Sequence, residues 1–248
     1  MEQRVNSFQP QDSGAKAPTE LRVSISYCLK AGLVGVAVLV ALHLARAYLV
    51  FGLGYNPLGL DKFDLNAEQS FVTWFSSTIL LIGGVLAILT GWVERQARAP
   101  YWIMWVILGA IFVGMSADEV AGLHEISGKY LKQHTDWSGV LYYRWVVIGA
   151  VFAGAVGLFY LRFLLWLDAR TRFLLLLAAA LYLGGTLGIE VIGAVREEEI
   201  GSRANDLVYT LLVVVEETLE MTGSIVFAVA LLDRLRRTTS GAYLILDR

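Results

Sequence analysis

The stretch LVYTLLVVVEETLEMTGSIVFAVALL, residues 207–232, is long and apolar enough to cross a membrane, yet it carries three glutamates near its middle. An apolar helix of about 20 residues crosses the roughly 30 Å hydrocarbon layer of a bilayer. An acid at the centre of such a helix costs about 2.5–3.5 kcal/mol on insertion, so Glu216, Glu217 and Glu220 together cost about 9 kcal/mol. We therefore expect a membrane helix whose acids face other helices rather than lipid.

Five further apolar stretches are similar in length to this one. Each is continuous and lacks the alternation with period two of a membrane barrel strand, which favours helices. The composition agrees, because 56% of the residues are hydrophobic, 17% are charged and the mean hydropathy is +0.60. The sequence predicts an all-α polytopic membrane bundle with six transmembrane helices at 28–53, 71–93, 101–118, 141–166, 172–194 and 207–232.

The basic residues predict the orientation of this membrane domain, which covers residues 28–232 between polar tails at 1–27 and 233–248. If both tails are cytoplasmic, thirteen Lys and Arg lie on the cytoplasmic side and seven lie elsewhere. Cytoplasmic loops carry an excess of Lys and Arg, so we expect both termini inside. The net charge of -2 shows no basic excess, and we expect no nucleic-acid partner.

Small residues recur within the predicted spans. In the fifth span, Gly184 and Gly188 have the GxxxG spacing that lets two membrane helices approach closely. We expect a close helix contact there.

Acidic residues and a histidine also interrupt two other spans. The third span ends in SADEVAGLHE, residues 116–125, and the fifth contains Glu190. Helical residues three or four apart share a face, so Glu216 and Glu220 lie on one stripe with Glu217 beside them. If residues 101–125 form one helix, Asp118, His124 and Glu125 lie within an arc of about 120°, whereas Glu119 points about 100° away.

These side chains lie at similar depth. At about 1.5 Å per residue, the acids of the third, fifth and sixth spans fall in the outer half of the bilayer. We expect a carboxylate-rich pocket there, with the first span, which holds His43, as its candidate floor, although a packed, hydrogen-bonded role for His43 is the simpler interpretation. The inner half of the bundle is expected to be apolar.

Carboxylates and histidine from facing helices are the ligand set of metal sites in helical bundles. Oxygen-rich ligands with imidazole suit Fe, Mn or Zn, and one or two such divalent ions are the predicted cofactor. No Glu-x-x-His sequence occurs, so the hypothesis depends on ligand types and helix geometry. The predicted catalytic residue is Glu217, as a general base, and the predicted metal ligands are Asp118, His124, Glu125, Glu190, Glu216 and Glu220.

A metal at this depth favours a lipid or lipid-linked substrate, in which it would polarise an ester or phosphate. A first alternative is a proton- or cation-coupled transporter or channel, because chains of Asp, Glu and His also relay protons. The chain shows no internal repeat, and this argues against a transporter because many secondary transporters contain inverted repeats. A second alternative is a non-catalytic membrane assembly protein, in which residues 118–125 are simply a water-facing continuation of the third span.

The segments SADEVAGLHE (116–125) and EETLEMTG (216–223) resemble those of uncharacterised bacterial multi-span membrane proteins. Those proteins carry a D-E then H-E segment and a later E-E-x-x-E-M-x-G segment. The resemblance covers three spans and implies a location in the bacterial inner (plasma) membrane. It implies no activity.

Overall fold

The computed structural model describes residues 24–67, 69–201 and 206–238, and within these ranges the chain is helical and contains no strand. Two helices are extended by π-helical turns: Tyr48–Gly52 continues the first, and Gly184–Ile189 joins the sixth to the seventh. The helices are α1 (Ile25–Ala47), α2 (Phe71–Gln96), α3 (Trp102–Ala121), α4 (Leu123–Lys132), α5 (Trp145–Trp166), α6 (Ala169–Leu183), α7 (Glu190–Ile200) and α8 (Leu207–Thr238).

Five of the helical segments in the described chain are long and apolar enough to cross a membrane. They coincide with the first five predicted spans and extend over Ile25–Gly52, Phe71–Gln96, Trp102–Ala121, Trp145–Trp166 and Ala169–Ile200. The sixth predicted span is α8, and it is not among them, because its glutamates and its terminal arginines interrupt the apolar sequence. It continues to Thr238, beyond the predicted boundary at residue 232. Of the predicted tails, residues 1–23 and 239–248 lie outside the described residues.

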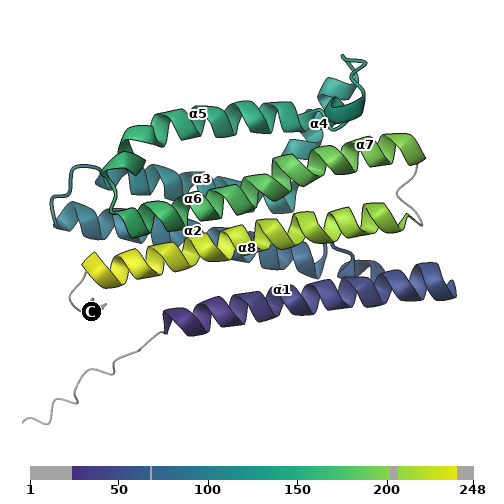
Figure 1. Cartoon of the computed structure of the whole chain (residues 1–248), viewed down its shortest axis with the longest axis horizontal. Coiled ribbons are helices and arrows are strands. Elements are labelled where there is room, and N and C mark those ends of the chain that lie inside the picture. The colour runs from purple at the N-terminus through teal and green to yellow at the C-terminus, as the bar shows by residue number, and fades with distance from the viewer. Residues whose placement is uncertain (1–23, 68, 202–205, 239–248) are drawn as a thin grey trace, which may run out of the picture.

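The long helices lie side by side in one bundle with α8 in the middle (Figure 1). α8 contacts α1, α2 and α6, while α2 and α3 form an antiparallel pair. α1 begins and α8 ends at the same end of the bundle (Figure 1). Two buried clusters stabilise this arrangement: Trp105, Phe163 and Leu231 belong to one, and Val36 and Val213 belong to the other.

Glycine allows α8 to approach α6 closely, but at positions other than those expected. A Cβ atom at Gly185 would lie 2.7 Å from the carbonyl oxygen of Glu216, and one at Gly223 would lie 2.7 Å from the backbone nitrogen of Tyr182. A Cβ at Gly184 or Gly188 would have no neighbour within 4 Å. The GxxxG prediction was therefore wrong, because the face turned to α8 is the one that carries Gly185.

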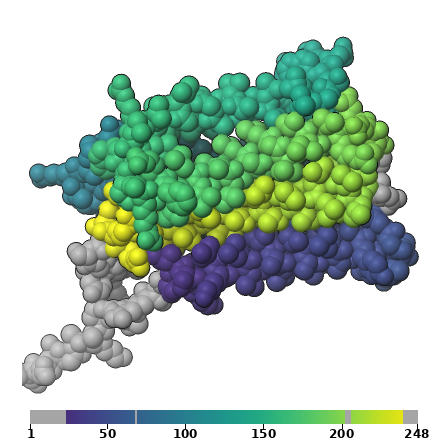
Figure 2. Space-filling view, in the orientation of Figure 1, coloured from purple at the N-terminus to yellow at the C-terminus, as the bar shows by residue number. Residues whose placement is uncertain are grey.

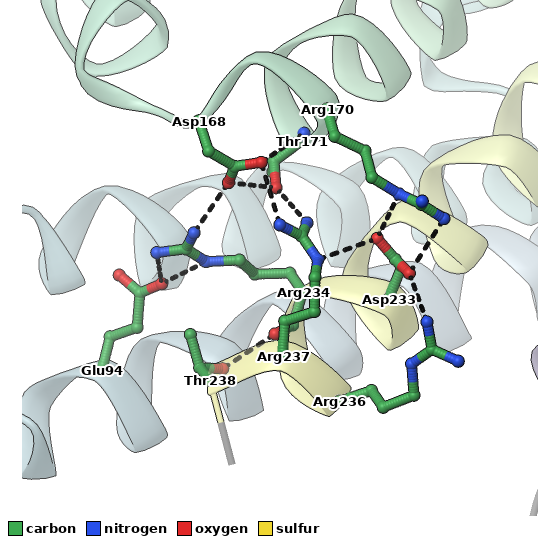
Figure 3. A network of polar contacts seen from close by, with 9 residues as sticks. All are labelled: Glu94, Asp168, Arg170, Thr171, Asp233, Arg234, Arg236, Arg237 and Thr238. Carbon is green, nitrogen blue, oxygen red and sulfur yellow. Dashed lines mark hydrogen bonds and ion pairs between the residues drawn. The ribbon is translucent and has the colours of Figure 1, made fainter. Parts of the chain in front are cut away.

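Ion pairs connect α2, α6 and α8 at the end of the bundle where α8 finishes (Figure 3). Arg234 lies 2.8 Å from Glu94 and 2.8 Å from Asp168. Arg237 lies 2.9 Å from Asp168 and 3.1 Å from Asp233. These ion pairs lie beyond the predicted spans, in the breaks and the tail that the sequence placed at the cytoplasmic ends of the helices, and every acid of the network is paired with arginine.

Candidate functional site

A cavity of about 180 Å³ lies near the opposite end of the bundle from this network, between α3, α4, α7 and α8. Its lining includes an acid that was expected to point away, Glu119, and residues 65–67 of the loop before α2. No Lys or Arg is among the described residues that line it. All seven predicted site residues line this cavity: Asp118, His124, Glu125, Glu190, Glu216, Glu217 and Glu220.

The α7 and α8 acids meet where the two helices come closest. The Gly184–Ile189 π-helical turn ends directly before Glu190, and Gly185 in this turn allows the backbone of Glu216 to approach. Glu190 accepts a hydrogen bond of 3.2 Å from Nε1 of Trp145 on α5. The carboxyl groups of Glu190 and Glu216 both line the cavity at this place.

Asp118 and His124 are brought together by a break between helices. α3 ends at Gly122, whose φ of 60° lies in the left-handed region that favours glycine. Asp118 accepts hydrogen bonds from the His124 backbone N–H at 2.9 Å and from its Nδ1 at 2.8 Å. The helical stripe that was expected to join Asp118 to His124 and Glu125 is therefore broken at Gly122, whereas Asp118 and Glu119 both lie on α3.

His124 lies outside the membrane-spanning segments, on α4. Burial by itself lowers the pKa of His124, but the hydrogen bond and charge of Asp118 outweigh this effect and raise the pKa above its ordinary value of 6.5. The His124 ring also meets the Trp145 ring edge-on, with 5.0 Å between their centroids. His124 is therefore held in a fixed orientation at the cavity wall by one acid and one aromatic ring.

Glu125 lies at the rim of the cavity, on α4. Its carboxylate is 2.8 Å from the ammonium of Lys129, and 36% of its side chain is exposed. Two tyrosines, Tyr143 and Tyr209, also line the cavity. The Tyr143 hydroxyl donates to Glu197 and lies 3.3 Å from the Tyr209 hydroxyl. Glu125 is thus partly solvated and paired with a lysine.

α1 positions the cavity loop and contributes no lining residue of its own. His43 is buried, and its Nδ1 accepts a 3.0 Å hydrogen bond from the N–H of Leu65. Nδ1 therefore carries no proton, and the cationic partner of Asp64 is Arg46, at 2.7 Å. These contacts hold the loop so that Leu65 lines the cavity together with residues 66 and 67. The candidate floor is thus the loop, and His43 has the packed, hydrogen-bonded role that we expected.

No group of three or more His, Cys, Asp or Glu side chains in the described parts of the chain is arranged to hold a metal ion. The acids therefore line one cavity without forming a complete coordination shell. A buried carboxyl group without a basic partner is protonated or binds a cation. The arrangement is thus suited to bind protons or metal ions and not anions.

A family profile described as a domain of unknown function (DUF8692) matches residues 31–235, which include all the described residues of the cavity. No curated protein and no solved structure matches the chain.

Proposed function

The chain belongs to the DUF8692 family, whose function is unknown, and we propose from the cavity that this membrane protein binds one or two divalent metal ions and acts on a lipid or lipid-linked substrate. Fe, Mn and Zn are the metals that suit carboxylate and imidazole ligands. The observation that carries the proposal is the lining of the cavity, which contains seven carboxyl groups and His124 but no described Lys or Arg.

We place α8 in the membrane as a sixth span. It is 32 residues long, so it extends over about 48 Å, and it lies among the five apolar helices. With six spans both termini lie on one side, and the excess of Lys and Arg assigns that side to the cytoplasm. A bacterial inner membrane is the location that the sequence resemblance favours.

The proposed ligands come from four elements that face the cavity. Asp118 comes from the end of α3, His124 from the start of α4, Glu190 from the start of α7, and Glu216 and Glu220 from α8. Glu125, paired with Lys129, is the outermost member of the set.

A bound metal ion would supply Lewis acidity for hydrolysis of an ester or phosphate, or for oxygen activation if it were iron. The residues of the chain have distinct roles beside it. Glu217 lines the same cavity one residue from Glu216, and we assign it the role of general base. Trp145 holds Glu190 through its indole N–H.

Metal analysis of the purified protein tests the proposal. We expect stoichiometric Fe, Mn or Zn in the wild type, and metal binding at least about tenfold weaker in Glu220→Gln and in Glu216→Gln. Glu199→Gln is the matched control, because Glu199 is an acid of α7 outside the cavity lining. Size-exclusion chromatography reports whether each variant is folded. A wild type without stoichiometric metal, or unchanged binding in both cavity variants, would overturn the proposal.

Proton translocation is the second candidate, and the seven carboxyl groups that line one cavity favour it because chains of such acids also relay protons. The test is a pH-driven flux in reconstituted vesicles, measured for the wild type and for Glu217→Gln. A flux that this substitution abolishes would replace the metal proposal. Wild-type vesicles without flux would exclude this candidate.

A further inference from the structure

A second and larger cavity, of about 680 Å³, lies between α5 and the helices α3, α6 and α8. α5 is attached mainly near its two ends: the His124 and Trp145 rings meet at one end, and the Tyr160 hydroxyl donates to the Met104 carbonyl oxygen at 2.8 Å near the other. The middle of α5 stands away from α6, and the molecular surface is hollowed there (Figures 1 and 2). We call this cavity the α5 groove.

The α5 groove is lined almost entirely by apolar side chains along its length. It becomes polar where it meets the first cavity, the one lined by Glu190, Glu216 and Glu220, which we call the carboxyl cavity. Phe112, Val156 and Leu176 belong to its apolar part. Six residues line both spaces, namely Met115, Asp118, His124, Trp145, Tyr182 and Thr186. An apolar channel that opens onto acids suits a molecule with a hydrocarbon chain and a polar head.

The α5 groove is long enough to hold one acyl chain. Its lining on α5 runs from Trp145 to Leu164, about 28 Å along the helix. An acyl chain of one leaflet covers about half of the roughly 30 Å hydrocarbon layer. The volume also falls within the roughly 300–1,000 Å³ that is usual for small-molecule sites.

The charges where the α5 groove meets the carboxyl cavity decide which polar head group a bound molecule can carry. No Lys or Arg is among the described residues of either lining, so a phosphate or carboxylate head would find no basic side chain other than His124, which Asp118 already engages. An ammonium head would find the acids of the carboxyl cavity and the rings of Trp145 and Tyr182. Carboxylates and aromatic faces are the groups that recognise ammonium ions.

We propose that the α5 groove binds a long-chain aliphatic amine, with its chain along α5 and its ammonium group at Asp118, Trp145 and Tyr182. This assignment goes beyond the proposed function, because an aliphatic amine carries no ester or phosphate. The binding itself depends on the chain and the acids and requires no metal.

Direct binding to the purified protein in nanodiscs tests the head group. The probes are radiolabelled hexadecylamine, hexadecanoic acid and hexadecyl phosphate, each measured with metal-stripped and metal-supplemented protein. We expect the amine to bind at least about tenfold more tightly than either anion. Equal or tighter binding of an anion to the metal-stripped protein would overturn the proposal.

A pair of alanines on α5 tests the location of the chain. Ala153 lines the groove, whereas Ala155 is exposed on α5 outside the lining. We expect Ala153→Trp to weaken amine binding at least about tenfold and Ala155→Trp to change it less than about twofold, because only the first side chain occupies the space of the ligand. Equal effects of the two substitutions would refute the location.

The outcomes separate this proposal from the metal site. Amine binding by a protein that never contains metal would leave the inference standing and remove the proposed function. A protein that contains stoichiometric metal but does not bind the amine more tightly than the anions would support the proposed function and overturn the inference about the α5 groove.

Discussion

Loss of Arg234 should destabilise the protein far more than loss of a neighbouring arginine. Glu94 is only 1% exposed, and its Oε1 lies 2.8 Å from both Nε and Nη2 of Arg234. Its other oxygen, Oε2, has no hydrogen-bond partner among the described residues. Removing Arg234 therefore leaves a buried carboxylate without compensation, which costs about 3–5 kcal/mol. Asp168 contributes less, because Thr171 and Arg237 still contact it.

The matched control is Arg236→Met, two residues along the same helix. The side chain of Arg236 is 67% exposed and lies 3.3 Å from Asp233, which also contacts Arg170 and Arg237. An exposed pair of this kind contributes about 0–1 kcal/mol. We expect Arg234→Met to lower the free energy of unfolding by about 3–5 kcal/mol and Arg236→Met to lower it by less than about 1 kcal/mol.

The free energy of unfolding is best measured in bilayers at neutral pH by steric trapping. The double variant Glu94→Met/Arg234→Met should recover most of the loss, because an apolar pair replaces a buried ion pair at little cost. If Arg234→Met costs no more than Arg236→Met, Glu94 is reached by water. The reasoning from its burial is then refuted.

Two further predictions concern the residues that flank α6. Gly185→Ala should lower the free energy of unfolding by about 1–3 kcal/mol, because its Cβ would lie 2.7 Å from a backbone oxygen of α8. Gly184→Ala, with no neighbour within 4 Å, should be neutral or stabilising by up to about 1 kcal/mol, and similar losses in both variants would contradict the contact. At Asp168, burial raises the pKa, but hydrogen bonds from Thr171 and the charge of Arg237 outweigh it and hold the pKa below the ordinary value of 3.8. Because the folded-state pKa is lowered, this stabilisation is present above pH 3.8 and is lost as the pH falls through the folded-state pKa. The free energy of unfolding, measured from about pH 5 to about pH 2, should therefore fall more steeply in the wild type than in Asp168→Asn. An equal dependence on pH in the two proteins would contradict a lowered pKa of Asp168.

Hydrophobic length and the cost of buried charge were enough to predict much of this protein from its sequence. Continuous apolar stretches predicted five helices within a few residues, because a helix satisfies its own backbone hydrogen bonds in hydrocarbon. The acids of α8 were predicted to face other helices, because lipid penalises them, and they line a cavity with Glu190 and Asp118. The α8 sequence was the strongest single predictor of the candidate site.

Only the tertiary structure decided how the remaining parts meet. The turn at Gly122, and not a helical stripe, places His124 against Asp118, because one left-handed residue redirects the chain after it. Contacts between distant segments, such as His43 with Leu65 or Glu94 with Arg234, leave no periodic trace in a single sequence. The α5 groove is a space between helices, so it depends on how α5 packs at its two ends and on no local pattern of residues. Helix formation and burial are local preferences that a sequence displays directly, whereas cavities and ion pairs arise from packing between elements that only the folded chain brings together.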